Sequence, residues 1–307
     1  MIRVAVIGGG QNCEHEVSLA SAAAAAAALD PTRYDVVQMT IGLDGRWNDG
    51  PLGEAVDLVG SCDVVLPLLH GPRGEDGTLA ALCELAGVPY VGSGVRAGAL
   101  AMDKHTTKLV ARSHGIATAS GALLTRATAS SYGWEGPVVV KPVAAGSSQG
   151  VSLVRTEAEL APAIAGALHH DDRVLVEEVL VGREIDLAVL TTDGRHVVAP
   201  ALEIRVAGFF DFAAKYDGSA GFVVPAALTE AELKGLEHAA VTMYDALGCA
   251  GVARVDFFLT ESGPVLNEVN TAPGFTEQSQ VPKMFAAAGT SYAELLDLLV
   301  RDALARD

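Results

Sequence analysis

Near its carboxyl end the chain contains two short stretches, RVDFFL and VLNEVN, in which polar and apolar residues alternate. A period of two predicts β-strands, and it places Arg254 and Asp256 on one face of the first strand. In the second strand it places Glu268 and Asn270 on one face. The turn-forming residues 261–264 lie between the strands and favour a hairpin. The sheet containing this hairpin must therefore accommodate a dense polar face within an otherwise very apolar chain.

The polar face of this hairpin has the chemistry of a magnesium site. Pairing of the strands brings Asp256, Glu268 and Asn270 together as three oxygen ligands, which suit Mg²⁺ better than Zn²⁺ and also accept Mn²⁺. Residues 271–274 (TAPG) then leave the sheet and expose backbone N–H groups. The alternative is a hairpin with one solvated face, but an arginine, three ligand-type residues and a Pro-Gly exit favour a functional site.

The overall composition restricts the kind of ligand. Asp and Glu total 38 and Lys and Arg total 21, so the net charge of -17 opposes attraction to nucleic acid or anionic lipid. Hydrophobic residues make up 50% of the chain and the mean hydropathy is +0.32, yet no stretch of spanning length lacks charges or turn residues. We therefore expect small-molecule ligands, with no nucleic acid and no membrane as partner.

The amino terminus and the cysteines favour a cytoplasmic protein. Residues 2–7 have the pattern of a core strand and lack the small-residue cleavage site of a secreted precursor. The four cysteines are widely spaced without a CxxC pair, which indicates neither a zinc site nor a disulfide framework. Cys13 lies in a glycine-rich loop without an evident base, so we expect a neutral thiol.

The first third of the chain alternates apolar strands with helices, as in a parallel α/β sheet. Strands are expected over residues 2–7, 34–41 and 63–69, and an alanine-rich helix over 17–29 suits close packing on the sheet. The glycines after the first strand do not complete a dinucleotide-binding fingerprint, because Cys13 occupies the position of the third glycine.

Two polar loops at strand ends of this sheet indicate a binding site. The first, QNCEHEVS, contains Glu14 and Glu16, and the second covers residues 70–77. The carboxyl ends of neighbouring parallel strands form the usual binding crevice of such sheets. The alternative for the two glutamates is stabilisation of the helix N-terminus through its dipole, and this stretch alone does not decide between them.

The middle of the chain contributes lysines and a glycine- and serine-rich loop. A helix is predicted over residues 95–113, in which Lys104 and Lys108 share a face, as is usual for a solvated surface. Lys141 lies near the end of a strand, and residues 143–150 join it to the next strand. Such a loop can cover phosphates with N–H groups and a point charge. It is not a Walker A loop, and an ordinary flexible hairpin is the alternative.

The remaining segments complete a mixed α/β pattern. Residues 205–224 surround aromatic and cationic side chains with glycines, which indicates a mobile lid over ligand, although a static packed loop has the same pattern. The other expected elements are a helix over 156–169, a strand over 174–179, antiparallel strands over 182–190 and 197–204, and helices over 229–247 and 291–306.

Together these stretches resemble the D-alanine--D-alanine ligases of the ATP-grasp superfamily, over nearly the whole chain. The order of the matching blocks makes the resemblance specific: residues 14–19 (EHEVSL), 70–77, 102–104 (MDK), 141–142 with 146–148, and 267–282. The resemblance implies an α/β ATP-grasp fold of three domains. These are an N-terminal parallel-sheet α/β domain (1–93), a small central α+β domain (94–180) and a C-terminal α+β domain (181–307).

By this resemblance, ATP lies between the central and C-terminal domains. Lys104 and Lys141 contact its phosphates, residues 177–180 lie along the adenine and Glu184 holds the ribose. The residues matched to ligands of two magnesium ions, which hold the γ-phosphate in line, are Asp256, Glu268 and Asn270. The full set expected to bind the nucleotide is Lys104, Lys141, Ser147, Ser148, Glu177, Glu178, Leu180, Glu184 and Lys215.

The family ligates two D-alanines through an acyl phosphate, for peptidoglycan precursor synthesis, and commonly forms homodimers. Glu14 matches the group that holds the first ammonium, and Glu14, Ser147 and Tyr216 match a hydrogen-bonded triad. Arg254 and the Gly274 N–H match the groups that stabilise the tetrahedral oxyanion. Ser279 and Lys215 are expected to bind the second carboxylate. The expected substrate contacts are therefore Glu14, His70, Lys215, Ser279 and Gln280.

Two positions depart from the family pattern. Gln149 replaces a customary valine in the phosphate loop, and Gln280 stands where an apolar residue usually lies near the second substrate. A polar side chain there would favour another acceptor, such as D-serine or D-lactate, unless it points to solvent. The Lys215-Tyr216 pair resembles the dipeptide-forming members, so we expect D-alanine as acceptor. A nucleotide-binding regulator without turnover is the alternative outside the enzymes.

Overall fold

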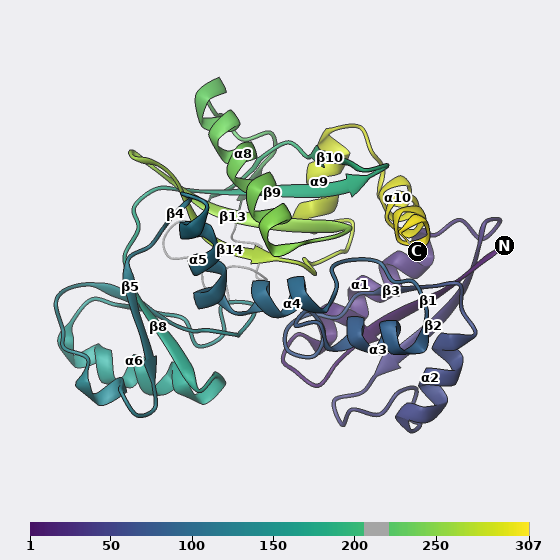
Figure 1. The fold of residues 1–307 in the computed structure, drawn as a ribbon, viewed down its shortest axis with the longest axis horizontal. Coiled ribbons are helices and arrows are strands. Elements are labelled where there is room, and N and C mark those ends of the chain that lie inside the picture. Colours follow the sequence, from purple (N-terminus) through teal and green to yellow (C-terminus); the bar gives the residue numbers. More distant parts are fainter. Residues whose placement is uncertain (206–220, 307) are drawn as a thin grey trace.

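The computed structural model describes residues 1–205 and 221–306, whose strands form three sheets arranged as three lobes (Figure 1). Lys215 and Tyr216 lie outside the described residues, as does the part of the predicted lid over residues 206–220, so the lid stays a prediction. No helix in the described ranges is long and apolar enough to cross a membrane.

The first sheet is parallel throughout, with strand order β2-β1-β3, as the alternation of strands and helices predicts. A Cβ atom at Gly8 of β1 would lie 2.6 Å from the Cβ of Ala22, so the alanine-rich helix α1 packs closely on the strand. The elements of this part are β1 (Ile2–Gly9), α1 (His15–Ala28), β2 (Tyr34–Ile41), α2 (Leu52–Gly60), β3 (Val64–Pro67) and α3 (Thr78–Ala86).

The second sheet is antiparallel, with order β5-β8-β6-β7. Its apolar face, including Val140 and Val174, packs on helix α6, so Lys141 and Glu177 point to the other face. The elements are β5 (Gly121–Thr125), the 3-10 turn η1 (Ala129–Ser131), β6 (Val138–Pro142), β7 (Ser152–Val154), α6 (Glu157–His170) and β8 (Arg173–Glu178).

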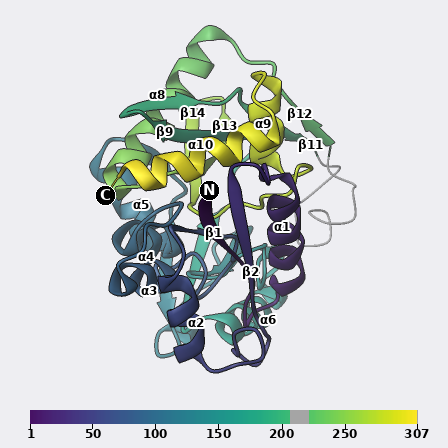
Figure 2. The ribbon, with the colours of Figure 1, turned by 90° about the vertical axis from the view of Figure 1, so that its right-hand side faces the viewer.

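The third sheet has the order β12-β11-β9-β13-β14-β4, and β10 also pairs with β9. Helices α5 and α8 pack on this sheet, and α10 contacts both β9 and elements of the first lobe (Figure 2). The strands are β4 (Ala117–Thr118), β9 (Arg183–Thr192), β10 (Arg195–Val198), β11 (Leu202–Arg205), β12 (Gly221–Val223), β13 (Val252–Thr260) and β14 (Gly263–Asn270). The helices are α4 (Val95–Met102), α5 (Lys104–Ser113), α8 (Glu230–Leu247), α9 (Gln280–Ala287) and α10 (Tyr292–Ala305).

The single helix predicted over residues 95–113 is wrong, because the chain breaks at Asp103 into α4 and α5. Asp103 is extended, with φ -82° and ψ 95°, and its carboxylate accepts the Thr106 N–H at 2.7 Å as the N-cap of α5. The same carboxylate pairs with Arg173 on β8 at 2.8 Å. The break therefore starts a new helix at Lys104, which packs on β14 and α8 of the third lobe.

The hydrophobic core connects the first and third lobes. One cluster of buried residues includes Val4 and Val6 of β1, Phe275 after β14, and Leu295 and Leu299 of α10. The predicted domain division assigns α4, α5 and β4 to the central domain, whereas these elements contact β14 or α8 of the third lobe. The domain boundaries stay a prediction.

Candidate active site

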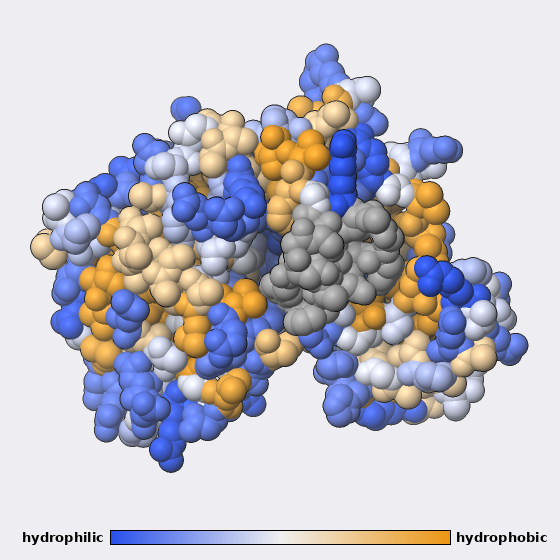
Figure 3. All heavy atoms as spheres, turned by 180° about the vertical axis from the view of Figure 1, so that it is seen from behind, coloured by the Kyte–Doolittle hydropathy of each residue, from blue (hydrophilic) through white to orange (hydrophobic). Residues whose placement is uncertain are grey.

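A cleft of about 1130 Å³ lies where the three lobes meet. On the face shown in Figure 3, a notch separates the lobe of the first sheet from that of the second. Of the residues predicted from the sequence, those that line the cleft are Glu14, His70, Lys104, Lys141, Ser147, Ser148, Glu177, Glu178, Leu180, Glu184, Arg254, Asp256, Glu268, Asn270, Gly274, Ser279 and Gln280. The structure thus brings together every predicted site residue that it describes.

The predicted hairpin forms from β13 and β14, with Asp256 opposite Glu268 and Arg254 opposite Asn270. Arg254 donates two hydrogen bonds to the carboxylate of Asp256, from Nε at 2.7 Å and Nη2 at 2.8 Å. Burial lowers the pKa of Arg254, but the attraction of Asp256 and of Asp186 on β9 outweighs it and raises the pKa overall. A permanently charged guanidinium is therefore fixed at the floor of the cleft.

The predicted metal ligands are held by protein groups on the same face. Nζ of Lys104 lies 3.1 Å from Oε2 of Glu268, and Oδ1 of Asn270 accepts the Ala272 N–H at 3.1 Å. Among the described residues, no group of three or more His, Cys, Asp or Glu side chains is placed to hold a metal ion. Two carboxylates and an amide nevertheless provide only oxygen donors, which fits Mg²⁺. The metal assignment stays a prediction.

The glycine- and serine-rich loop between β6 and β7 contacts the first lobe. The hydroxyl of Ser147 donates to the carboxylate of Glu14, which is buried. A Cβ atom at Gly146 would lie 2.5 Å from Oε2 of Glu14, and one at Gly71 would lie 2.7 Å from the same atom. Glycine at both positions therefore allows the Glu14 carboxylate to enter the cleft. Two members of the predicted triad are in contact, and Tyr216 is outside the described residues.

The loop after β3 contributes Glu75, which the sequence analysis did not single out. Its carboxylate accepts the Gly71 N–H at 2.5 Å, and its backbone carbonyl accepts the Thr271 hydroxyl at 3.5 Å. Burial, followed by repulsion from Glu14, raises the pKa of Glu75 to about 8. The signal was the acidic loop of residues 70–77 itself, but its burial depends on the distant segment that contains Thr271.

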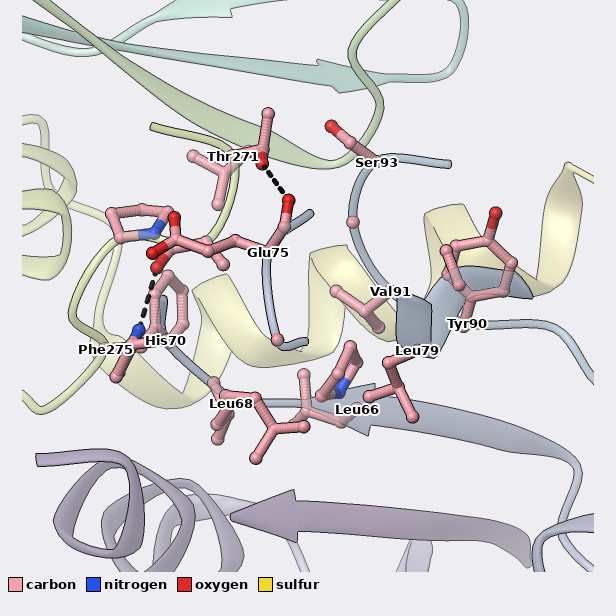
Figure 4. A pocket seen from close by; sticks show the side chains of 18 of the residues that line it. Leu66, Leu68, His70, Glu75, Leu79, Tyr90, Val91, Ser93, Thr271 and Phe275 are labelled. Atoms are coloured by element: carbon pink, nitrogen blue, oxygen red, sulfur yellow. Dashed lines mark hydrogen bonds between the residues drawn. The ribbon is translucent and has the colours of Figure 1, made fainter. Parts of the chain in front are cut away.

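His70 lies beside Glu75 and faces the exit from the hairpin (Figure 4). Its Nδ1 is 2.9 Å from the carbonyl oxygen of Ala272, and its Nε2 is 3.4 Å from the Ser21 hydroxyl. Burial lowers the pKa of His70, more than the Ala272 carbonyl and the Glu14 charge raise it. A neutral imidazole that donates from Nδ1 to Ala272 fits these contacts.

The interpretation of Lys104 and Lys108 as a solvated helix face is wrong. Nζ of Lys104 reaches the Ala145 carbonyl at 2.8 Å across the cleft. Lys108 is 1% exposed and forms an ion pair with Glu177, which also holds Lys141 at 2.8 Å. Tertiary packing of α5 between two lobes, which the helix period does not reveal, determines this burial.

The exit segment after β14 places Ser279 and Gln280 at the start of α9. The Ser279 hydroxyl accepts the Thr276 N–H at 3.0 Å, and a Cβ atom at Gly274 would lie 3.4 Å from that oxygen. Gln280 is partly buried and lines the cleft. The helix over residues 280–287 was not predicted from the sequence.

Known proteins share both the sequence and the fold. A family model described as the D-ala D-ala ligase N-terminus matches residues 3–58 and 50–93, and one described as the C-terminus matches residues 115–301. Proteins named D-alanine--D-alanine ligase from Mycolicibacterium paratuberculosis and from Mycobacterium sp. (strain KMS) are 41% and 42% identical. Both alignments cover 99% of this chain, with 97% and 96% of the relatives.

Two solved structures are similar over the whole chain. The VanG D-Ala:D-Ser ligase from Enterococcus faecalis has a TM-score of 0.86 and 35% identity, covering 98% of this chain and 99% of that one. The D-alanine--D-alanine ligase from Bacillus anthracis complexed with ATP has a TM-score of 0.83 and 30% identity, covering 100% and 98%. From its sequence, its three-lobed fold and its cleft, the chain belongs to the D-alanine--D-alanine ligase family.

Proposed function

We propose that this protein ligates two D-alanines to D-alanyl-D-alanine, using ATP. The observation that carries the proposal is the convergence in one cleft of two lysines, the Asp256–Glu268 carboxylates, the fixed guanidinium of Arg254 and the buried Glu14. A carboxylate is a poor acylating agent, so the reaction needs a phosphoryl donor and an anionic pocket for a substrate ammonium. The cleft offers groups suited to both.

In this proposal each lobe has one task. Glu14 of the first lobe, with its oxygen held by Ser147, binds the ammonium of the first D-alanine. Lys104 and Lys141 bind the phosphates of ATP, and residues 177–180 with Glu184 line the nucleoside. Asp256, Glu268 and Asn270 hold magnesium, which supplies charge neutralisation and alignment of the γ-phosphate when it is bound.

The chemistry then proceeds in two transfers. The carboxylate of the first D-alanine attacks the γ-phosphorus and releases ADP, giving an acyl phosphate. The amine of the second D-alanine attacks the acyl carbon, phosphate leaves, and the amine loses a proton. Arg254 and the Gly274 N–H stabilise the tetrahedral oxyanion, while Ser279 and Lys215 hold the carboxylate of the second substrate. We place the reaction in the cytoplasm, in a homodimer, as a step of peptidoglycan precursor synthesis.

A D-alanine ligase with another acceptor is the second candidate. Gln280 lines the cleft next to Ser279, and one structural neighbour is titled a D-Ala:D-Ser ligase. A buried amide without a partner lowers affinity for a purely apolar acceptor. The named relatives at 41% and 42% identity are D-alanine--D-alanine ligases, which supports D-alanine as the acceptor.

The test supplies ATP, Mg²⁺ and D-alanine, with D-serine, D-lactate or no second acceptor, and identifies products by mass. We expect D-alanyl-D-alanine together with equal amounts of ADP and phosphate. Formation of another ligation product without D-alanyl-D-alanine would establish the second candidate. If no ADP is released with any of these acceptors, a nucleotide-binding regulator without turnover remains as the interpretation.

A further inference from the structure

Lys108 forms an unusual buried cluster with Glu177 and Lys141. Its side chain is 1% exposed, and its ammonium contacts Oε1 of Glu177. The other oxygen of the same carboxylate, Oε2, lies 2.8 Å from Nζ of Lys141. One carboxylate is thus shared by two lysines, although burial of a charge is unfavourable unless an opposite charge balances it.

The two lysines contact different oxygens of this carboxylate. Lys141 lines the cleft, and its Nζ lies 3.2 Å from Oδ1 of Asn267 on β14. Lys108 does not belong to the lining that the described residues form. Lys108 approaches from α5, which packs on β14 and α8. Helix α5 therefore holds the ammonium of Lys108 against Glu177 away from the cleft lining, whereas Lys141 lines the cleft.

This arrangement changes the charge that the cleft presents. With Glu177 alone, Lys141 would form a balanced ion pair and have little charge left for a ligand. With Lys108 on the second oxygen, the three groups carry one positive charge in excess. A buried excess charge attracts an anion more strongly than an exposed one, because the local dielectric constant is low.

We propose that Lys108 is a positioning residue of the nucleotide site: by sharing Glu177 with Lys141, it leaves Lys141 free to hold a phosphate group. This inference rests on the proposed ATP binding and extends it to a residue outside the cleft lining. Lys108 acts through Glu177 and Lys141 and does not contact the nucleotide itself.

The protonation of Lys108 provides independent support. Burial and the charge of Lys141 lower the pKa of Lys108 to about 8, against the opposing effect of Glu177. The charged groups that face Lys108 are Glu177 of β8 and Lys141 of β6. Lys104, which pairs with Glu268, lies one helical turn before Lys108 on α5. An anion bound at Lys141 favours the charged form of Lys108, so binding takes up protons where Lys108 is partly neutral.

The test measures ADP binding with Mg²⁺ by titration calorimetry at pH 7, for the wild-type protein, Lys108→Met and Lys108→Arg. We expect Lys108→Met to weaken ADP binding about tenfold or more, and Lys108→Arg to retain most of the affinity. In turnover, the KM for ATP should rise while the KM for D-alanine stays constant. Lys234→Met is the matched control, because Lys234 is exposed on α8 and its ion pair within the described residues is an i,i+4 contact with Glu230.

The outcomes are distinct. ADP affinity of Lys108→Met within twofold of wild type would overturn the role of Lys108 and leave the proposed function intact. Failure of the wild-type protein to bind ADP would overturn the proposed function itself. If Lys108→Met does not fold, wild-type binding at about pH 8.5 in two buffers of different ionisation enthalpy decides: proton uptake supports the proposal, and no uptake overturns it.

Discussion

At the scale of single residues, the cleft holds its charges in partly buried ion pairs. Arg254 is paired with Asp256, and Lys104 with Glu268. Removal of one partner from such a pair leaves an uncompensated charge, so its effect is larger than the net contribution of the pair. A substitution at these positions therefore has to be separated from a loss of folding before it is assigned to chemistry.

Glu268→Gln tests the metal assignment with the smallest change of shape. The amide keeps an oxygen donor but loses the charge that attracts Mg²⁺, and it leaves Lys104 without its carboxylate. We expect turnover to fall by roughly 10²–10³-fold, as for the loss of one preorganised transition-state contact. Initial rates of ADP release at saturating ATP, with circular dichroism to confirm the fold, measure this effect.

The matched control is Glu261→Gln, at an exposed position in the turn of the same hairpin. It removes the same charge from the same strand pair without changing the polar face. We expect its turnover to stay within twofold of wild type. Near-normal activity of Glu268→Gln, or an equal loss in both variants, would contradict the assignment of Glu268 to the metal.

Glu75 makes the protein less stable as the pH rises, whereas a salt-bridged carboxylate makes a protein less stable as the pH falls. Its pKa of about 8 lies above the value of 4.5 of an ordinary glutamate, so the folded state binds the additional proton. The stability that this proton provides is present below the unfolded pKa and is lost as pH rises through about 8. Glutamine resembles the protonated acid, so Glu75→Gln should be the more stable protein at high pH.

We expect the free energy of unfolding of Glu75→Gln to exceed that of wild type by about 1–2 kcal/mol at pH 9 and to equal it near pH 5. The difference is smaller than the full pKa shift implies, because Glu75 is partly exposed to solvent. Urea denaturation at the two pH values, with fixed ionic strength, gives the difference in free energy of unfolding. A constant difference between the proteins at both pH values would show that Glu75 does not titrate in this range.

At the scale of elements, sequence patterns predicted the helices and strands that neighbouring residues alone determine. The hairpin β13–β14 follows from a period of two and a turn sequence, and pairing brings Asp256 opposite Glu268, in line with the predicted convergence of these carboxylates. The helix break at Asp103 was not predicted, because its carboxylate is fixed partly by Arg173 from another sheet. Burial of Lys108 and partial burial of Glu75 were missed for the same reason, since both depend on segments far away in sequence.

The loop between β6 and β7 offers a prediction at this scale. A Cβ atom at Gly146 would overlap Oε2 of Glu14, so Gly146→Ala must displace either the loop or that carboxylate. We expect the KM for D-alanine to rise by about tenfold, because the ammonium site loses its geometry, with little change in thermal stability. Steady-state kinetics with D-alanine varied at saturating ATP measures this.

Gly166→Ala provides the control, because it lies in α6 with no heavy atom within 4 Å of the added Cβ. The alanine should leave the kinetics unchanged and stabilise the helix by about 0.5–1 kcal/mol. If Gly146→Ala binds D-alanine as the wild type does, the contact between the loop and Glu14 has no part in substrate binding.

At the scale of the whole molecule, three sheets supply different groups to one cleft. The ordered blocks of sequence identified the family, because the order of the blocks along the chain is specific even where the elements between them are misjudged. The path of α10 between the first and third lobes, and the shared core with Phe275 and Leu295, were beyond sequence reasoning. Both depend on how the lobes dock, which no local period encodes.

A ligand that contacts several lobes should stabilise the molecule as a unit. Binding to the folded state alone contributes about 2.7 kcal/mol at a hundredfold excess over Kd. For a chain of this size, that corresponds to a rise of about 4 °C in the midpoint of thermal unfolding. We expect MgADP to produce such a shift, and EDTA to remove most of it, because the carboxylates of the β13–β14 hairpin then face the phosphates without a cation.

Glu268→Gln should respond to ADP equally with and without EDTA, whereas Glu261→Gln should behave as the wild type. An undiminished shift in the presence of EDTA would show that Lys104 and Lys141 suffice for the nucleotide and that the hairpin does not bind it through a metal.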